Sequence, residues 1–252
     1  MTIFTCNDTF ESMMTCIYDA WDSHLGHANI RLEIAHEGNL ELFCEYRHIS
    51  SDVHKAQKVI RSIQNKISWK AYSMIYAASL SPSPEKVDII YRFLLLGFSY
   101  GKHITDQIQH PLVMPLFELQ RKVFNEAHYF KEFIRFSDVQ NTVLLAKIEP
   151  KCHVLTLIAP HFADRMPSEN WLIMDAIRQQ AIVHPKDCAY YLTPLSSEEI
   201  QYIEEAMNLP DPYIDLWKGF FQTIGIKERK NDRCQRNMLP LWYRKNMTEF
   251  IR

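Results

Sequence analysis

Hydrophobic and polar positions in the first part of the chain predict a strand followed by a helix. Residues 2–6 alternate in the manner of a short β-strand. Asp8 and Glu11 have the spacing of a capping box, and apolar residues then recur every three to four positions from Phe10 to Trp21. This spacing predicts an amphipathic helix with one face toward a core.

Two further alternating stretches follow this helix, over residues 30–34 and 40–46. Glu37-Gly38-Asn39 between them has the composition of a turn, so the two stretches predict a β-hairpin with one buried face. With the first strand and helix, the hairpin would complete a small β-α-β-β lobe over residues 1–50.

Helical spacing dominates the next eighty residues. The pattern predicts helices over residues 53–67, 69–80, 85–102 and 111–131. Ser81-Pro-Ser-Pro84 ends the second of them, because proline cannot continue a helix and disfavours helical backbone in the residue before it. Helices are therefore expected to dominate from Ser51 to about Lys131.

From Phe133 the hydrophobic period changes to two, the period of a strand. Strands are predicted over residues 133–137, 142–149, 153–158, 170–175, 178–184 and 189–192. Their connections are short, so an antiparallel meander is the economical arrangement. One helix is expected to begin at Ser196 or Ser197, and another to cover residues 211–224.

These patterns predict an α+β fold in a single compact domain over residues 1–252. Its expected parts are the β-hairpin lobe (1–50), a helical segment (51–131), and an antiparallel sheet with C-terminal helices and a basic tail (132–252). A chain of this length buries about 70–75% of its extended-chain surface, so it can hold a core without a disulfide or a metal.

Cysteine usage and hydropathy narrow the class of protein. The six cysteines include no CxxC pair, which argues against a zinc site, an iron–sulfur cluster and a disulfide framework. The N-terminus has no basic region followed by an apolar core, and Arg92 interrupts the longest apolar run. We therefore expect a soluble cytoplasmic protein without a membrane segment, a metal or a cofactor.

A concentration of histidine, arginine and aromatic residues lies at the two ends of residues 125–165. His128 lies near the end of a predicted helix, and Arg135 lies on the strand that follows. After two more strands, Pro160-His161 opens a short turn, and Arg165 lies one turn further on. The topology would bring His128, Arg135, His161 and Arg165 to one rim, where arginine could bind phosphate and an aromatic ring could stack a base.

Two other interpretations of this cluster stay open. His128 and His161 could act as general acids or bases near neutral pH, or all four residues could have a structural role at helix and strand ends. Asp175 and Arg178 lie at a strand turn and are expected to form an internal salt bridge or a turn hydrogen bond. No nucleophile motif, glycine-rich phosphate loop or histidine–metal pattern accompanies them. The sequence therefore favours binding over catalysis.

The C-terminal segment is basic although the chain as a whole has a net charge of −2. Residues 227–252 contain eight Lys or Arg and three acids, a net charge of +5, which leaves −7 on the rest. In addition to Arg135, His161 and Arg165, the residues expected to contact nucleic acid are Trp217, which precedes this segment, and Arg229, Lys230, Arg233, Arg236 and Trp242 within it. A basic, aromatic-bearing end on an acidic body is typical of nucleic-acid binding, and a solvated tail is the alternative.

Several segments resemble one uncharacterised bacterial family, most clearly from Glu126 onward. They are residues 126–136, the APHFADR segment at 159–165, and residues 216–231, 234–240 and 245–250. Three positions depart from that family's pattern: Tyr129 replaces a common arginine, Glu132 a common glycine and Asp232 a common proline. The family is described as acting in DNA repair or DNA metabolism, and has no established catalytic residues.

The resemblance implies a pathway and partners for this chain. Members of the family are encoded beside a radical-SAM protein of DNA repair or modification, and the related domain also occurs fused to uracil-DNA-glycosylase-like domains. The expected function is a DNA-binding accessory partner of such an enzyme. The alternatives are a hydrolase acting on nucleic acid through His128 or His161, and a protein-interaction module without DNA contact.

Overall fold

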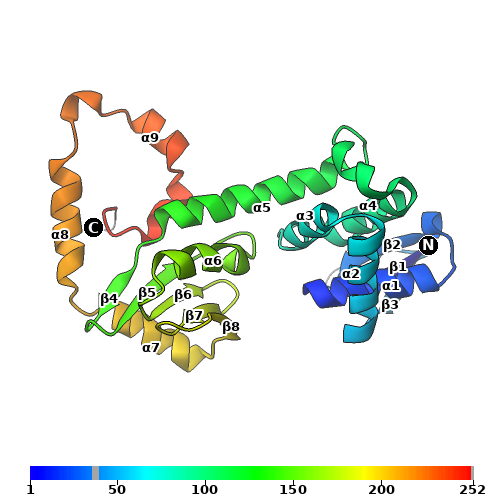
Figure 1. Cartoon of the computed structure of the whole chain (residues 1–252), viewed down its shortest axis with the longest axis horizontal. Coiled ribbons are helices and arrows are strands. Elements are labelled where there is room, and N and C mark those ends of the chain that lie inside the picture. Colours follow the sequence, from blue (N-terminus) through cyan, green and yellow to red (C-terminus); the bar gives the residue numbers. More distant parts are fainter. Residues whose placement is uncertain (36–39, 251–252) are drawn as a thin grey trace. The chain divides into compact units, whose positions relative to one another are not determined.

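The computed structural model describes residues 1–35 and 40–250, and its fold is α+β (Figure 1). The described chain divides into two compact units, Met1–Phe124 and Asn125–Arg252, each of which is treated by itself. The single compact domain expected for the chain stays a prediction. No helix within the described ranges is long and apolar enough to span a bilayer.

The first unit contains a three-stranded sheet of β1 (Thr2–Cys6), β2 (Ile30–Ile34) and β3 (Glu45–His48). β1 lies in the middle, and both neighbours run parallel to it. The predicted β-hairpin is therefore wrong, since β2 and β3 do not pair, and its expected turn at residues 37–39 lies outside the described residues. Alternation identifies a strand with one buried face, but it does not identify the strand's neighbour.

Helices build the rest of this unit, close to the predicted ranges. They are α1 (Phe10–Asp22), α2 (Val53–Lys66), α3 (Trp69–Ser79), α4 (Lys86–Tyr100) and the first half of α5 (Met114–Phe133), with short 3-10 turns at His27–Asn29 and Gly101–Asp106. The side chains of Thr9, Asp52 and Ser68 cap the first three of these helices by accepting backbone hydrogen bonds. One core extends from Phe4 to Leu119, so the expected segment 1–50 and the expected helical segment as far as Leu119 fold around a common interior.

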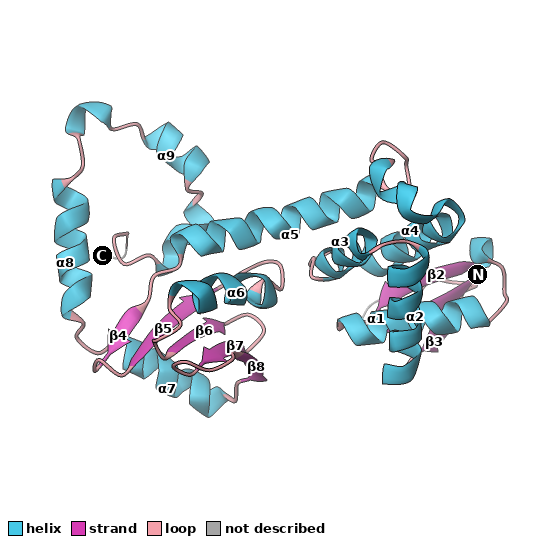
Figure 2. Ribbon diagram, in the orientation of Figure 1, coloured by secondary structure: helices cyan, strands magenta, loops and turns pink. Residues whose placement is uncertain are grey.

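The second unit contains a five-stranded sheet in sequential order (Figure 2). Its strands are β4 (Ser137–Val139), β5 (Val143–Ile148), β6 (Trp171–Asp175), β7 (Gln180–His184) and β8 (Tyr191–Pro194). β5 and β6 are parallel, and the other neighbours are antiparallel. A parallel pair needs a crossover, which α6 (Leu155–Arg165) supplies.

Two predictions about this sheet are therefore wrong. The expected strand at 153–158 is the start of α6, and the expected meander is interrupted between β5 and β6. Leu155, Ile158, Ala159 and Phe162 are buried at the spacing of one helix face. A short apolar run fits both a strand and a buried helix, so the period alone did not separate them.

The C-terminal part of the second unit is helical, and its first two helices lie where they were predicted, from Ser196 or Ser197 and over residues 211–224. It consists of α7 (Ser197–Met207), α8 (Pro212–Thr223), a 3-10 turn (Lys227–Arg229), α9 (Asp232–Met238) and a last 3-10 helix (Leu241–Asn246). α7 packs through Ile203 against Leu145 and Met174 of the sheet. α8 and α9 form an arch, and after α9 the chain returns to the end of α5 (Figure 1).

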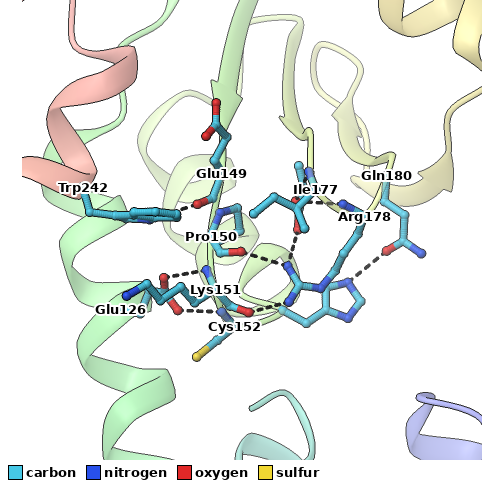
Figure 3. A network of polar contacts seen from close by, with 11 residues as sticks. Glu126, Glu149, Pro150, Lys151, Cys152, Ile177, Arg178, Gln180 and Trp242 are labelled. Atoms are coloured by element: carbon cyan, nitrogen blue, oxygen red, sulfur yellow. Dashed lines mark hydrogen bonds and ion pairs between the residues drawn. The ribbon is translucent and has the colours of Figure 1, made fainter. Parts of the chain in front are cut away.

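Two charged side chains fix the loop between β5 and α6 (Figure 3). Glu126 of α5 accepts hydrogen bonds from the backbone N–H groups of Lys151 and Cys152, at 2.8 and 2.7 Å. Arg178 donates to the carbonyl oxygens of Pro150 and Lys151, at 3.1 and 2.6 Å. The expected salt bridge between Arg178 and Asp175 is confirmed at 3.0 Å. These bonds join α5, the β6–β7 turn and the start of α6.

Replacing Glu126 by glutamine should destabilise this loop. One carboxylate oxygen becomes an NH2 donor that faces a buried backbone N–H, and an unsatisfied buried donor costs about 1–3 kcal/mol. We expect a lower urea midpoint and faster hydrogen exchange at the Lys151 and Cys152 amides. Glu118→Gln, on the same helix, is the control and should change neither. Unaltered exchange in Glu126→Gln would contradict the assignment.

Candidate functional site

An open pocket of about 630 Å³ lies where the C-terminal half of α5, residues 134–136 and the end of α6 meet. The four residues expected at one rim all line it: His128, Arg135, His161 and Arg165. Their convergence is thus confirmed, although the local structure differs from the prediction. Arg135 follows the end of α5 and precedes β4, and His161 and Arg165 lie inside α6, not on a turn.

Helix periodicity places the polar side chains of the pocket. His161 and Arg165 are four residues apart on α6, and His128 and Lys131 are three apart on α5, so each pair shares a helix face. Lys131 was not singled out from the sequence. Its position one turn after His128 on a predicted helix was the signal that could have identified it.

The surroundings of His161 are positively charged. Burial lowers its pKa below the ordinary value of 6.5, and the charges of Lys131 and Arg165 lower it further, against a smaller opposite effect of Asp164. At neutral pH this imidazole is therefore mainly uncharged and can offer one N–H donor. The side chain of His128 is 70% exposed, and its Nε2 lies 2.9 Å from a carboxylate oxygen of Glu132.

Arg135 is held by the C-terminal segment. Its guanidinium forms an ion pair with Glu249 at 2.7 Å, and the Glu249 side chain is only 1% exposed. Burial acts to raise the pKa of Glu249, but hydrogen bonds from Arg135 and Trp217 outweigh it and hold that pKa below its usual range. Lys131 and Arg165 are consequently the pocket cations best placed to meet a ligand.

The two tryptophans expected to stack a base are in contact with cations of the chain. Arg135 lies 5.4 Å from the ring centre of Trp217. Lys245 lies 4.0 Å from that of Trp242, whose indole N–H donates to the carbonyl of Glu149 at 3.0 Å. The pocket has an aromatic ring of its own, because partly exposed Phe136 lies against Phe162 at its wall.

The basic C-terminal residues divide into two groups. Four of them have exposed side chains, on the 3-10 turn, on the link that follows it and on α9: Arg229, Lys230, Arg233 and Arg236. Arg244 and Lys245 instead serve the fold, because Arg244 donates to the carbonyl of Leu239 at 3.0 Å and Lys245 pairs with Glu149 at 2.9 Å. None of the exposed four lines the pocket.

The departures from the expected family pattern also have partners here. The ring of Tyr129 packs against that of Tyr243 in a tilted arrangement, with ring centres 4.9 Å apart, and Glu132 pairs with His128. In the part of the chain that the structure describes, no three His, Cys, Asp or Glu side chains gather in a way that could hold a metal ion.

A family model matches the part of the chain that contains this pocket. The family described as a domain of unknown function, DUF4130, matches residues 84–249, which is more than half of the chain. The chain is a member of that family. The matched range includes every residue that lines the pocket and leaves out residues 1–83. No curated protein matches the chain.

The pKa of His161 provides a test of the pocket's electrostatics. Replacing Lys131 by glutamine removes one of the two positive charges that lower this pKa, so the pKa should rise toward 6.5. NMR titration of the His161 ring protons measures it. Lys186→Gln, on the β7–β8 loop, removes an equal charge elsewhere and should leave the value unchanged. Equal shifts in the two variants would contradict this account.

Proposed function

We propose that this protein binds DNA through the pocket between α5 and α6 and serves as an accessory partner of a radical-SAM enzyme of DNA repair or modification. The observation that carries the proposal is the convergence of Lys131, His161 and Arg165 on one open, positively charged pocket. DNA repair and the partner are taken from the family resemblance of residues 126–250.

The chemistry of the pocket suits a phosphodiester. Arg165 offers a planar fork of donors for two phosphate oxygens, and Lys131 adds a compact charge. The uncharged imidazole of His161 supplies a further N–H donor, and the bound anion would raise its pKa toward protonation. Phe136 at the wall could contact an unstacked base.

The exposed basic residues of α9 and the preceding turn support the same proposal. Arg229, Lys230, Arg233 and Arg236 are exposed to solvent. Two acids lie among them, Glu228 and Asp232, and Asp232 is 3.9 Å from Lys230. Such a segment attracts a polyanion from solution and adds to the salt dependence of binding. It would contact the backbone of DNA without selecting a sequence.

The second candidate function is hydrolysis of a bond in nucleic acid. The observation that favours it is that His128 and His161 line the same pocket, and that His161 has the lowered pKa of a group that is uncharged at neutral pH. His161 would then take a proton from an attacking water. Accumulation of cleaved or base-free oligonucleotide with the wild type, and none with His161→Ala, would establish this function.

Binding of fluorescein-labelled DNA, followed by fluorescence anisotropy at low salt, tests the leading proposal. The double variant Lys131→Gln/Arg165→Gln should bind roughly tenfold or more weakly. Its salt slope on duplex DNA should fall by about 1.8, because each lost phosphate contact contributes about 0.9. A slope equal to that of the wild type would contradict the pocket's role.

The matched control is Lys122→Gln/Lys186→Gln. It removes the same two charges at exposed positions that do not line the pocket, so it corrects for net charge. We expect it to retain most of the wild-type affinity. Wild-type binding no tighter than that of an unrelated acidic protein would overturn the proposal as a whole.

The exposed apolar face of α8 supports the second part of the proposal, that the protein binds a radical-SAM enzyme. Its apolar side chains include Tyr213, Leu216 and Phe220, which are all exposed, and no residue of this helix is buried. The chain also lacks the CxxxCxxC pattern of a radical-SAM cluster, so that chemistry would have to come from a second protein. Asp211 holds the start of α8 to β4 by accepting a hydrogen bond from the Asp138 N–H at 2.8 Å.

Co-expression with the radical-SAM protein expected to be encoded beside it tests this half. Leu216→Asp/Phe220→Asp should abolish co-purification, because charge on an apolar contact face must be desolvated on binding. DNA binding by this variant should be unchanged. Tyr202→Asp, an exposed aromatic position on α7, is the control. Co-purification of the α8 variant at the wild-type yield would contradict the role of this face.

A further inference from the structure

A second pocket, of about 360 Å³, lies within the first unit and involves none of the residues discussed so far as DNA contacts. α1, α2 and α4 form it. Its walls combine three aromatic rings with two lysines: Tyr18, Trp21, Phe98, Lys58 and Lys66. An aromatic surface beside two cations is a combination that needs an explanation.

Neighbouring rings hold Trp21 in place. Phe98 meets it edge-on with ring centres 5.5 Å apart, and His27 packs against it at 4.9 Å. His27 is itself fixed by a 2.7 Å hydrogen bond between its Nδ1 and the hydroxyl of Tyr91, a buried residue. Trp21 nevertheless keeps 37% of its surface exposed. A ring that is already immobile loses little conformational entropy when a ligand stacks on it.

The two lysines lie on one face of α2. Lys58, Ser62 and Lys66 follow each other at intervals of four residues, so the lysines are about 12 Å apart along the helix axis. α2 contains no acidic residue. Within the described ranges neither lysine has an ion-pair partner, whereas Lys55 on the same helix is neutralised by Asp19 at 2.7 Å.

These features select one class of ligand. An apolar ligand would bury the lysines without compensating them, and a simple anion would make no use of the Trp21 ring. The bases of a duplex are stacked inside it and cannot reach such a ring. An unpaired nucleotide satisfies both halves of the pocket, with its base on the aromatic surface and its phosphates on the lysines. Asp22, also in the wall, could accept a hydrogen bond from the base.

We propose that the pocket between α1, α2 and α4 binds a nucleotide of single-stranded nucleic acid, with the base against Trp21 and flanking phosphates on Lys58 and Lys66. This site goes beyond the pocket between α5 and α6, and either can fail without the other. It lies mostly in the part of the chain that precedes the family match, since Phe98 alone of the five residues falls within residues 84–249.

Binding of a fluorescein-labelled oligothymidine of about ten nucleotides to the full chain tests this proposal, because that length spans a typical single-strand site. The variants are made in the Lys131→Gln/Arg165→Gln background, so that the other pocket contributes little. Trp21→Ala should weaken binding roughly tenfold, which is within the range for one stacked base, and Trp21→Phe should weaken it less. Lys58→Gln/Lys66→Gln should lower the salt slope by about 1.4.

Two matched controls and two competitors make the outcome decisive. Trp69→Ala removes an indole that is 68% exposed on α3, and Arg61→Gln removes a charge of α2 that does not line the pocket; both should bind normally. Unchanged affinity and salt slope in the lysine variant, whose two altered side chains are both exposed, would overturn the proposal. Equal competition by duplex, or by thymidine monophosphate at the same nucleotide concentration, would overturn the assignment to single strands.

Discussion

Glu126 and Arg178 hold the loop between β5 and α6 by hydrogen bonds to its backbone, Glu126 to N–H groups and Arg178 to carbonyl groups. The carboxylate of Glu126 accepts hydrogen bonds from two backbone N–H groups, and the guanidinium of Arg178 donates hydrogen bonds to two backbone carbonyl oxygens. Both side chains are anchored on regular structure, Glu126 in α5 and Arg178 at the β6–β7 turn beside fully buried Asp175. Because buried polar groups are costly when unpaired, the loop has few alternative positions.

This constraint determines where the pocket's chemistry lies. The loop leads into α6, so fixing it relative to Glu126 also fixes His161 and Arg165 relative to the turn of α5 that carries Lys131. Burial lowers the pKa of His161, and the charges of Lys131 and Arg165 lower it further. These two cations also line the open pocket. Arg135, by contrast, is the link between the pocket wall and the C-terminal segment through Glu249.

The sequence predicted features that depend on neighbouring residues better than contacts between residues far apart in the chain. Stripes such as Val53 to Ile67 predicted helices well, because several turns repeat the same spacing. The meeting of His128 with His161 was predictable from short connections, even though the element carrying His161 was assigned wrongly. The pairing of Arg135 with Glu249 was not, because 114 residues separate them and neither has a local signature.

The other differences between the predicted and the observed fold also arise from short patterns and long-range pairing. The run before Ile158 is too short for its period to distinguish a strand from a helix, and only the parallel pairing of β5 with β6 requires a crossover there. Alternation over 30–34 could not show that β1 lies between β2 and β3. The pocket at Trp21 is lined by side chains from three helices. In the sequence its aromatic residues and lysines look like those of any amphipathic helix, so the pattern gave no sign of a shared pocket.

The central claim is that DNA lies in the pocket between α5 and α6. Ultraviolet cross-linking of the protein to oligonucleotides that carry 5-bromodeoxyuridine, followed by mass spectrometry of the linked peptides, tests it most directly. The account predicts links to peptides from residues 128–136 and 159–166, whichever other segments are also labelled. Efficient cross-linking that leaves both of these peptides unmodified would contradict it.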